Sequence, residues 1–210
     1  MSIEDVFHVL ISQLRNNFCL NDREENLLNK ICSMRGGYSE TSECFAQSTC
    51  KYFNPKEGLN AFNSVIYCNF LYWVSRHLYK NGENLVADKV YYLNKMLNGV
   101  DLFYAIELPV HWSCEHPLGS VMGRAVYGDY FFFYQGCTVG GNHTNYPVIG
   151  KNVIMLSNSK ILGKSNIGDN VILSANTYVK DMDIPNNSIV FGQYPDITIK
   201  QNKNTDKFWK

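Results

Sequence analysis

Three ionisable residues in the second half of the chain have the types and the spacing of a proton-transfer site. His116 follows Glu115 in the string CEHPLGSVMG, and Asp101 lies fifteen residues before His116. Histidine titrates near neutral pH, so His116 has the chemistry of a base that accepts a proton from an attacking hydroxyl or amine. A carboxylate such as Asp101 on its other ring nitrogen would fix the tautomer and stabilise the imidazolium. A histidine beside a proline in a turn is also often structural, and His111 and His143 compete with His116 on spacing alone.

An apolar residue recurs every six positions through the segment that must hold this site. The residues at this step are Ile149, Met155, Ile161, Ile167, Leu173 and Val179. Four positions after each of the first five anchors, the residues are small enough to fill a narrow coil: Val153, Ser159, Ser165, Val171 and Thr177. A helix has a period of about 3.6 and a half-buried strand a period of about 2, so this spacing indicates a hexapeptide β-helix. Upstream, the same step predicts four further anchors, Val121, Tyr127, Phe133 and Val139. Asp183 interrupts the second row just before Pro185, which predicts the end of the repeat there.

Each coil of such a β-helix has three short strands, so about eighteen residues make one storey of a triangular prism. Asp101 and His116 are separated by almost one storey, which predicts that they lie on neighbouring storeys of one wall. Four extra residues interrupt the step of six between Val139 and Ile149. We interpret residues 141–148, GNHTNYPV, as a loop that protrudes from a corner, and loops on rigid scaffolds often carry functional residues.

The residues before Gly99 have the spacing of helices, several of which end at Gly or Asn-Gly. We expect helices over Ile3–Phe18, 24–34, 59–79 and 84–97, with a looser stretch over 38–54. The many aromatic residues on the last two predict core and subunit contacts. The predicted fold class is therefore α+β: a helical N-terminal domain (1–99), a parallel β-helix of hexapeptide repeats (100–200) and a polar tail (201–210).

Composition argues against several classes of protein. Lys and Arg total 19, as do Asp and Glu, so the formal net charge is zero and no nucleic-acid partner is expected. The 7 cysteines form no C-x-x-C pair, and the start MSIEDVFHVL is acidic where a signal peptide is basic, which indicates a reduced, cytoplasmic protein. The most apolar run, 64–74, is too short to cross a bilayer, so no membrane association is expected.

Three strings together resemble bacterial serine O-acetyltransferases, which are left-handed β-helix acyltransferases with hexapeptide repeats. The strings are DLFYAIELPVHWSCEHPLGSVMG, FFFYQGCTVGG and PVIGKNVIMLSNSKILGKSNIGDNVILSANTYV. The resemblance covers roughly residues 55–195. Its most specific features are T-x-G-G followed by a loop and a V-I-G repeat, and the Asp and His fifteen residues apart.

This resemblance implies that His116 is the catalytic base, that Asp101 is its partner and that acetyl-CoA is the acyl donor, transferred directly in a ternary complex. It implies a homotrimer, often paired through the helices into a dimer of trimers, with the donor in a groove between adjacent subunits. The backbone of Gly141, Ser157 and Ala175 would line that groove. No metal is expected.

The acceptor site departs from the family pattern. Family members hold the amino acid with an Asp beside the catalytic His, an Asp-Pro in the helical domain and an Arg-His pair before the Pro that closes the loop. Here these positions hold Glu115, Asn54 and Asn145-Tyr146, with His143 as a substitute donor on a shorter loop. Only Glu115 keeps its charge, and Asn does not replace a bidentate Arg, so both serine and a serine-like acceptor remain open. Members that bind the next enzyme of cysteine synthesis end in Ile, whereas this sequence finishes FWK, so that complex is not expected.

Two alternatives remain open. The first is a sugar O- or N-acetyltransferase of surface-polysaccharide biosynthesis. It is favoured by the substituted acceptor-binding positions and by aromatic residues at and near the loop, namely Tyr127, Phe131, Phe133 and Tyr146, whereas Glu115, a partner for an ammonium group, argues against it. The second is a non-catalytic β-helix scaffold or a metal-dependent hexapeptide enzyme such as a carbonic anhydrase. The anhydrase needs three histidines at metal spacing, which His111, His116 and His143 do not have.

Overall fold

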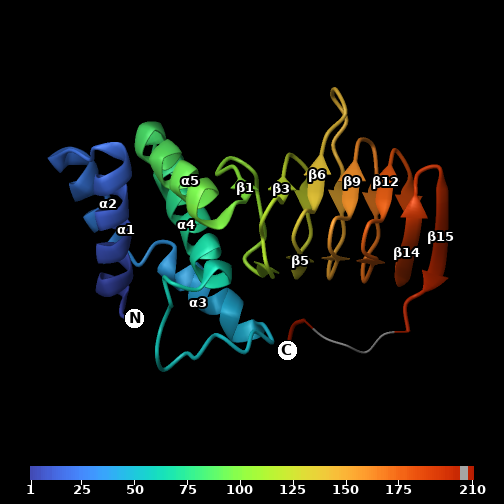
Figure 1. The fold of residues 1–210 in the computed structure, drawn as a ribbon, viewed down its shortest axis with the longest axis horizontal. Helices are drawn as coiled ribbons and strands as arrows, with labels where there is room; N and C mark the ends of the chain where they lie inside the picture. Colours follow the sequence, from blue (N-terminus) through green and yellow to red (C-terminus); the bar gives the residue numbers. More distant parts are fainter. Residues whose placement is uncertain (204–207) are drawn as a thin grey trace.

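The computed structural model describes residues 1–203 and 208–210 and has a helical half followed by a prism of short strands (Figure 1). The helices are α1 (Ile3–Phe18), α2 (Asp22–Ser33), α3 (Tyr38–Gln47), α4 (Ser64–Lys80) and α5 (Asn84–Asn98). Helices α1, α2, α4 and α5 match the ranges expected from the sequence to within a few residues at every end except the start of α4. The start of α4 is later than expected because the Asn63 side chain caps it, accepting hydrogen bonds from the backbone of Val65 and Ile66.

Helix α3 occupies the stretch that the sequence analysis left as a loose segment, so that expectation was wrong. Tyr38, Thr41, Cys44 and Phe45 recur at helical spacing and are all buried. The Glu40 carboxylate also accepts a hydrogen bond from the Gly37 N–H at 2.8 Å, which caps the start of the helix. A short helix of polar appearance is therefore stabilised by one buried face and one cap.

Helix α4 joins the helical half to the prism. It is buried along almost its whole length, and the ring of its Tyr72 lies 5.5 Å from the Trp112 ring of the first coil. The Tyr72 hydroxyl donates to the Ile106 carbonyl at 2.8 Å, and Arg76 donates to the same carbonyl at 2.9 Å. The helix therefore closes one end of the prism with both apolar contacts and hydrogen bonds.

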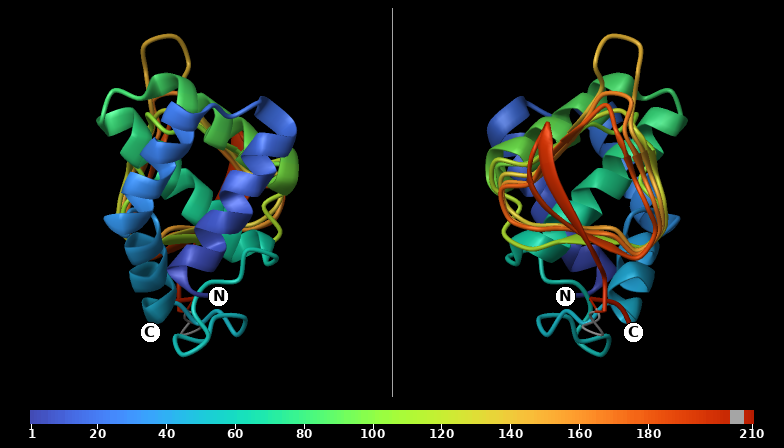
Figure 2. Two further views of the ribbon diagram at one scale, coloured as in Figure 1. Left: turned by 90° about the vertical axis from the view of Figure 1, so that its left-hand side faces the viewer. Right: turned by 90° about the vertical axis from the view of Figure 1, so that its right-hand side faces the viewer.

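The prism is a parallel β-helix with three walls, and Figure 2 shows its triangular outline end-on. The first wall contains β1 (Asp101–Leu102), β3 (Val121–Met122), β6 (Thr138–Gly140), β9 (Lys160–Leu162) and β12 (Tyr178–Lys180). The second wall contains β2 (Trp112–Cys114), β5 (Phe131–Phe133), β8 (Ile154–Met155), β11 (Ile172–Leu173) and β14 (Ser188–Gln193). The third wall contains β4 (Val126–Tyr127), β7 (Val148–Ile149), β10 (Asn166–Ile167) and β13 (Asp183–Ile184). The α+β class and the β-helix predicted from the repeat are confirmed.

The six anchors from Ile149 to Val179 are at most 3% exposed, and the second row, Val153, Ser159, Ser165, Val171 and Thr177, is fully buried. One upstream anchor was wrong, because Val121 is 40% exposed and Met122 is buried in its place. The cause is the register: Met122 pairs with Val139, seventeen residues later, so this storey is one residue shorter than three hexapeptides. A strand shifted by one residue turns its other face inward.

The repeat also extends beyond the stop expected at Asp183 and Pro185. Strand β13 pairs with β10, and Ile184 is 3% exposed under Ile167, so one more storey follows. That storey ends in an antiparallel pair of β14 with β15 (Asp196–Gln201), which covers the far end of the prism. Gln201 of the expected tail thus belongs to a strand, and residues 204–207 of that tail lie outside the described residues.

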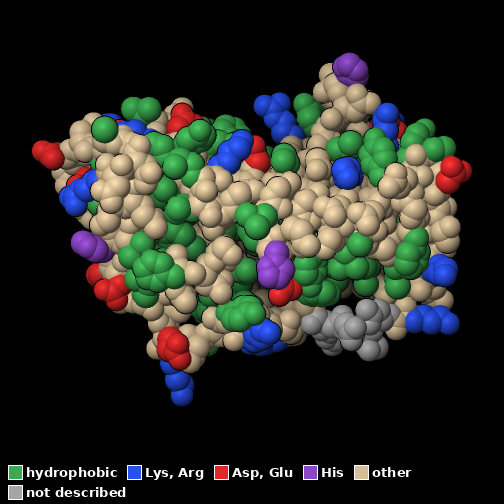
Figure 3. All heavy atoms as spheres, viewed as in Figure 1, with side chains coloured by type: hydrophobic (Ala, Val, Ile, Leu, Met, Phe, Trp, Pro, Cys, Tyr) green, Lys and Arg blue, Asp and Glu red, His purple; other side chains and the backbone are tan. Residues whose placement is uncertain are grey.

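On the face drawn in Figure 3, charged side chains of both signs are scattered over the helical half and the prism, with uncharged groups and backbone between them. Among the described residues, no helix combines the length and the apolar character needed to cross a bilayer.

Candidate functional site

Asp101 begins the first wall and is held from the helical half. Its two carboxylate oxygens accept hydrogen bonds from the Tyr91 hydroxyl at 2.7 Å and from the Lys95 ammonium at 2.6 Å. Both partners lie on α5, so the helix that precedes the prism fixes the orientation of this carboxylate. Burial is the largest cause that raises the pKa of the Tyr91 hydroxyl, and the neighbouring Asp101 carboxylate raises it further.

His116 lies in the turn after β2 and is exposed. Its backbone φ of 52° is in the left-handed region, which is uncommon for a residue with a side chain and frequent at sites of function. Within the described part of the chain, its ring has no hydrogen-bond partner. The imidazole is therefore open to a ligand or a neighbouring subunit.

Asp101 and His116 occupy successive storeys, but they do not share a wall. Asp101 pairs with Val121 on the first wall, whereas His116 lies at the corner where the second wall turns into the first. Backbone bonds join the two turns, since the Gly119 N–H donates to the Gly99 carbonyl at 2.8 Å. The expectation of one common wall is corrected, because six residues of turn separate β2 from β3 and His116 lies within them.

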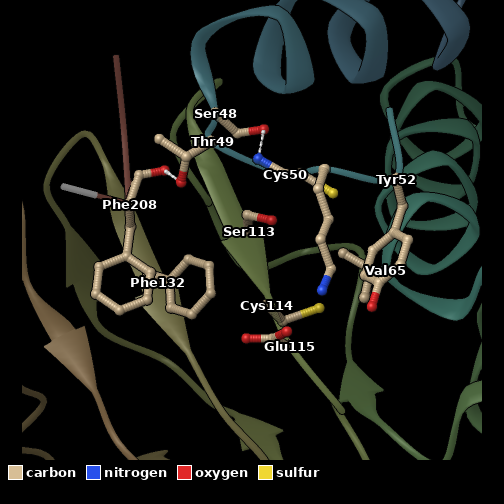
Figure 4. A pocket seen from close by; sticks show the side chains of 11 residues that line it. Ser48, Thr49, Cys50, Tyr52, Val65, Ser113, Cys114, Glu115, Phe132 and Phe208 are labelled. Atoms are coloured by element: carbon tan, nitrogen blue, oxygen red, sulfur yellow. Dashed lines mark hydrogen bonds between the residues drawn. The ribbon is translucent and has the colours of Figure 1, made fainter. Parts of the chain in front are cut away.

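Glu115, next to His116, lines a cavity of about 280 Å³ (Figure 4). Phe132 and Phe208 form one side of this cavity and Tyr52 and Val65 the other, with Glu115 between them. The remaining lining residues are Ser48, Thr49, Cys50, Lys51, Ser113 and Cys114. We call this space the Glu115 cavity.

The Glu115 cavity is lined by one charged side chain of each sign. Among the described residues that line it, Glu115 is the only acid and Lys51 the only base. Burial raises the pKa of the nearby Tyr134 to about 12, and the Glu115 carboxylate adds to that shift. A cavity with apolar walls and one charge of each sign suits a small zwitterion.

Lys51, Tyr52 and Phe208 were not among the site residues predicted from the sequence. Lys51 and Tyr52 follow α3, and Phe208 lies more than ninety residues after Glu115 in the sequence. The one available signal was proximity in sequence to Asn54, which the family pattern places in the acceptor site. No periodicity or motif marks Phe208.

Asn54 itself does not line the Glu115 cavity. Its side chain donates to a Glu57 carboxylate oxygen at 2.6 Å and accepts from the Lys56 N–H at 3.1 Å, so it stabilises its own turn. Asn54 thus has partners within its own turn, and its expected contribution to the acceptor site stays a prediction.

The loop that carries His143, Asn145 and Tyr146 protrudes from the prism between β6 and β7 (Figure 1). A bridge between Asn142 and Asn145 closes it, and the Tyr146 ring lies against Gly141. Both views in Figure 2 show the loop on the opposite side of the prism from the segment that follows α3. A single chain thus separates these three residues from Glu115, while a loop of this reach is suited to contact a neighbouring subunit.

The residues predicted to line the donor groove fall on two edges of the prism. Ser157 and Ala175 stack on consecutive storeys of the corner that also holds His116, and the Asn176 N–H donates to the Ser157 carbonyl at 2.9 Å. We call this corner the His116 edge. Gly141 lies instead at the corner between the first and third walls.

The aromatic residues that favoured a sugar acceptor do not form a binding surface. Phe131 and Phe133 are fully buried and Tyr127 is 8% exposed, so these rings fill the prism. Tyr146 is 42% exposed but lies on the protruding loop. The aromatic support for the sugar alternative is therefore lost, and the substituted acceptor-binding positions remain as its basis.

Cys114 and Cys137 are buried, and Cys50, which lines the Glu115 cavity, is half-buried; burial raises the pKa of the Cys50 thiol. The Cys68 and Cys114 sulfur atoms lie 3.8 Å apart, and this contact, together with burial, raises the pKa of the Cys114 thiol well above its ordinary value. Burial likewise raises the pKa of Cys137, which fills the coil. A thiol that resists ionisation is a weak nucleophile, which leaves His116 as the better-placed reactive group.

The histidines do not assemble into a metal site in the described part of the chain, where no group of three or more His, Cys, Asp or Glu residues is arranged to hold an ion. His111 instead stacks on Tyr130 with ring centroids 4.9 Å apart, and its Nδ1 lies 3.0 Å from an Asp129 oxygen. His111 thus has structural partners, unlike His116.

Comparison with known proteins agrees with this architecture. No protein-family model matches the chain. The serine acetyltransferase of Staphylococcus epidermidis is 30% identical over 161 residues, which are 74% of this chain and 71% of that protein. The serine acetyltransferase of Synechococcus elongatus is 31% identical over 124 residues, which are 57% of this chain but only 50% of the relative.

A solved structure extends the likeness to almost the whole chain. The serine acetyltransferase of Brucella abortus, solved in complex with coenzyme A, superposes with a TM-score of 0.73 at 18% identity and covers 96% of this chain and 82% of its own. This likeness includes the helical half as well as the left-handed β-helix. From its sequence relatives, with the shared fold in support, the chain belongs to the serine acetyltransferase family.

Proposed function

We propose that the protein transfers an acetyl group from acetyl-CoA to the hydroxyl of serine or a closely similar amino acid. The observation that carries this proposal is the Glu115 cavity, which holds a carboxylate suited to an ammonium group on the residue directly before the exposed His116; His116 itself is not among the residues that line the cavity. The names of the sequence relatives supply the acyl group and the acceptor.

In the proposed reaction, His116 takes the proton from the acceptor hydroxyl while that oxygen attacks the thioester carbonyl of acetyl-CoA. The thiolate of CoA leaves as the ester forms, and the proton on His116 neutralises it, directly or after exchange with solvent. No covalent acyl-enzyme is needed, since the raised pKa of the Cys50, Cys114 and Cys137 thiols makes each of them hard to ionise. Direct transfer in a ternary complex follows.

Asp101 is the proposed partner of the His116 imidazolium. Its oxygens already accept from Tyr91 and Lys95, but an ionised carboxylate has about four lone-pair positions and accepts a third hydrogen bond. The Lys95 ammonium shares the charge of Asp101, which weakens its effect on the imidazolium. We therefore expect Asp101 to orient His116 more than to increase its basicity.

For the acceptor, Glu115 would bind the ammonium and Lys51 the carboxylate. Lys51 would then supply the positive charge that the Asn145-Tyr146 positions lack. The apolar sides formed by Phe132 and Phe208 reduce the access of water, which strengthens both interactions. A zwitterionic hydroxy amino acid satisfies both charges, whereas an uncharged sugar would leave them unpaired.

For the donor, we propose a homotrimer in which acetyl-CoA lies between subunits. The His116 edge contributes Ser157 and Ala175, and the edge with Gly141 would come from the adjacent subunit, which explains why one chain does not bring the three together. The same packing would bring the loop with His143 and Tyr146 to the neighbour's site. Pairing of two trimers through the helices is the further assembly implied by the family.

The direct test is release of CoA thiol from acetyl-CoA with L-serine as acceptor. We expect serine-dependent release, and His116→Ala should lower kcat by about 10²–10⁴-fold. His8→Ala, which changes an exposed histidine on α1, is the matched control and should behave as the wild type. Release that depends on an amino sugar or nucleotide sugar and not on serine would refute the proposed acceptor, and full activity of His116→Ala would refute the proposed base.

A further inference from the structure

The last described residues return from the far end of the prism to the helical half. Strand β15 lies at the end of the prism away from the helices, yet Lys210 lies beside the segment that follows α3 (Figure 1). The Thr49 N–H and hydroxyl both donate to the Phe208 carbonyl at 3.0 Å. The Lys210 N–H donates to the Gln47 carbonyl at 2.8 Å, and its ammonium donates to the Ala46 carbonyl at 3.0 Å.

Trp209 anchors this segment between the two halves of the molecule. It is 6% exposed and packs with Cys44 of α3 and with Phe132, Ile154 and Ile172 of the second wall. Its ring centroid lies 5.5 Å from that of Tyr130. Burying an indole side chain so completely contributes a large apolar area, so the segment is bound by a specific site on the chain's own surface.

Phe208, fixed between this anchor and Thr49, forms part of the Glu115 cavity. Its ring centroid lies 4.5 Å from Phe132 and 6.3 Å from Tyr134, on the side of the cavity opposite Tyr52 (Figure 4). Removal of this ring would open the cavity to water near Glu115. Water raises the local dielectric constant and weakens the attraction between Glu115 and a bound ammonium.

We propose that Phe208 is a specificity-determining wall of the acceptor site and that Trp209 is the positioning residue that holds it there. This inference rests on the proposed function, because it takes the Glu115 cavity as the place where the amino acid binds. Segment 208–210 would thereby affect both the affinity for the acceptor and the size of acceptor that the cavity admits.

The physical consequence is a change in KM without a matching change in kcat. The Phe208 and Trp209 side chains supply none of the reacting groups, so chemistry at His116 continues once the acceptor is bound. An acceptor one methylene longer than serine, such as L-homoserine, should gain relative to L-serine when the Phe208 ring is removed, because the cavity is then larger.

The experiment compares full-length variants by CoA release, with thermal unfolding to verify that each is folded. For Phe208→Ala and for Trp209→Ala we expect KM for L-serine to rise about tenfold while kcat stays within about threefold of the wild type. Trp209→Phe should restore most of the affinity. Phe191→Ala, which removes a 38% exposed ring from β14, is the matched control and should leave KM unchanged.

The results separate this inference from the proposed function. Wild-type protein without serine-dependent release would overturn both. A normal wild type combined with an unchanged KM in Phe208→Ala would overturn the wall alone. A Trp209→Ala variant that loses kcat at constant KM would show that the indole supports the fold and does not position the wall. A Phe208→Ala variant with an unaltered preference between homoserine and serine would overturn the role of Phe208 in acceptor size.

Discussion

The substitution Lys51→Met tests whether the acceptor's carboxylate is bound by a residue that the family pattern does not contain. Lys51 and Glu115 are the two charged residues of the cavity, and Met keeps most of the length of the side chain while removing the ammonium. We expect KM for L-serine to rise with little change in kcat, because Lys51 binds the acceptor in the ground and transition states alike.

The size of the effect follows from the position of Lys51. Two opposite charges about 4 Å apart attract by about 1 kcal/mol in bulk water and by about 4 kcal/mol at an effective dielectric constant of 20. Lys51 is an exposed residue at a cavity with apolar sides, so a value of about 1–2 kcal/mol is expected. At about 1.4 kcal/mol per factor of ten, this corresponds to a rise in KM of about 5- to 30-fold.

The assay measures CoA release with L-serine and with L-serinamide, which keeps the hydroxyl and the ammonium but has no carboxylate. Lys51→Met should raise KM for serine and leave KM for serinamide almost unchanged. Lys56→Met, at an exposed lysine five residues later that does not line the cavity, removes the same charge and is the control. An equal rise for both acceptors, or an equal rise in the control, would show that Lys51 does not bind the carboxylate.

Three further predictions concern the catalytic partner and the fold. Asp101→Asn should lower kcat by about tenfold, less than loss of His116, since Lys95 already shares the charge of Asp101; a loss as large as that of His116→Ala in steady-state assays would contradict this. Burial acts to raise the pKa of Glu24, but hydrogen bonds dominated by Lys89 outweigh it and hold the pKa below its ordinary value. The ionised Glu24–Lys89 pair thus stabilises the fold at pH values above the ordinary pKa of a glutamate. This stabilisation is lost as the pH falls through the lowered pKa of Glu24. In urea unfolding, Glu24→Gln should cost about 3 kcal/mol at pH 7 and progressively less in acid, and an equal cost at about pH 3.5 would refute the pairing. Ile161→Ala, at a fully buried anchor, should lower the free energy of unfolding by about 2–5 kcal/mol, while Lys160→Ala on the same strand should change it by less than about 0.5 kcal/mol; similar losses in both would argue against the assigned register.

The sequence alone determined the β-helix and most of the helices. A step of six repeated without a break from Ile149 to Val179 is a local property of the chain, and the stacking of identical coils is the one arrangement that buries every such anchor. The error at Val121 shows the limit of this reasoning. One storey of seventeen residues shifts the register, and nothing in the alternation of Val121 and Met122 indicates which of two apolar neighbours turns inward.

Only the tertiary structure decided which residues share the candidate site. Spacing brought Asp101 and His116 to successive storeys, but the partners of Asp101 on α5 and the position of His116 at a corner depend on how the helical half packs against the first coil. The loop with His143 was correctly expected to protrude, yet its length did not indicate that it would lie opposite the segment after α3 that lines the Glu115 cavity.

The Glu115 cavity is the clearest case of this difference. Lys51, Glu115 and Phe208 come from the segment after α3, from the turn after β2 and from the end of the described chain, and no period or motif relates them. A repeat determines a fold because each residue contacts neighbours at a fixed separation in sequence. A site is determined by contacts between residues at unrelated separations, and these form only when burial of Trp209 and packing of α3 against the prism bring the distant segments together.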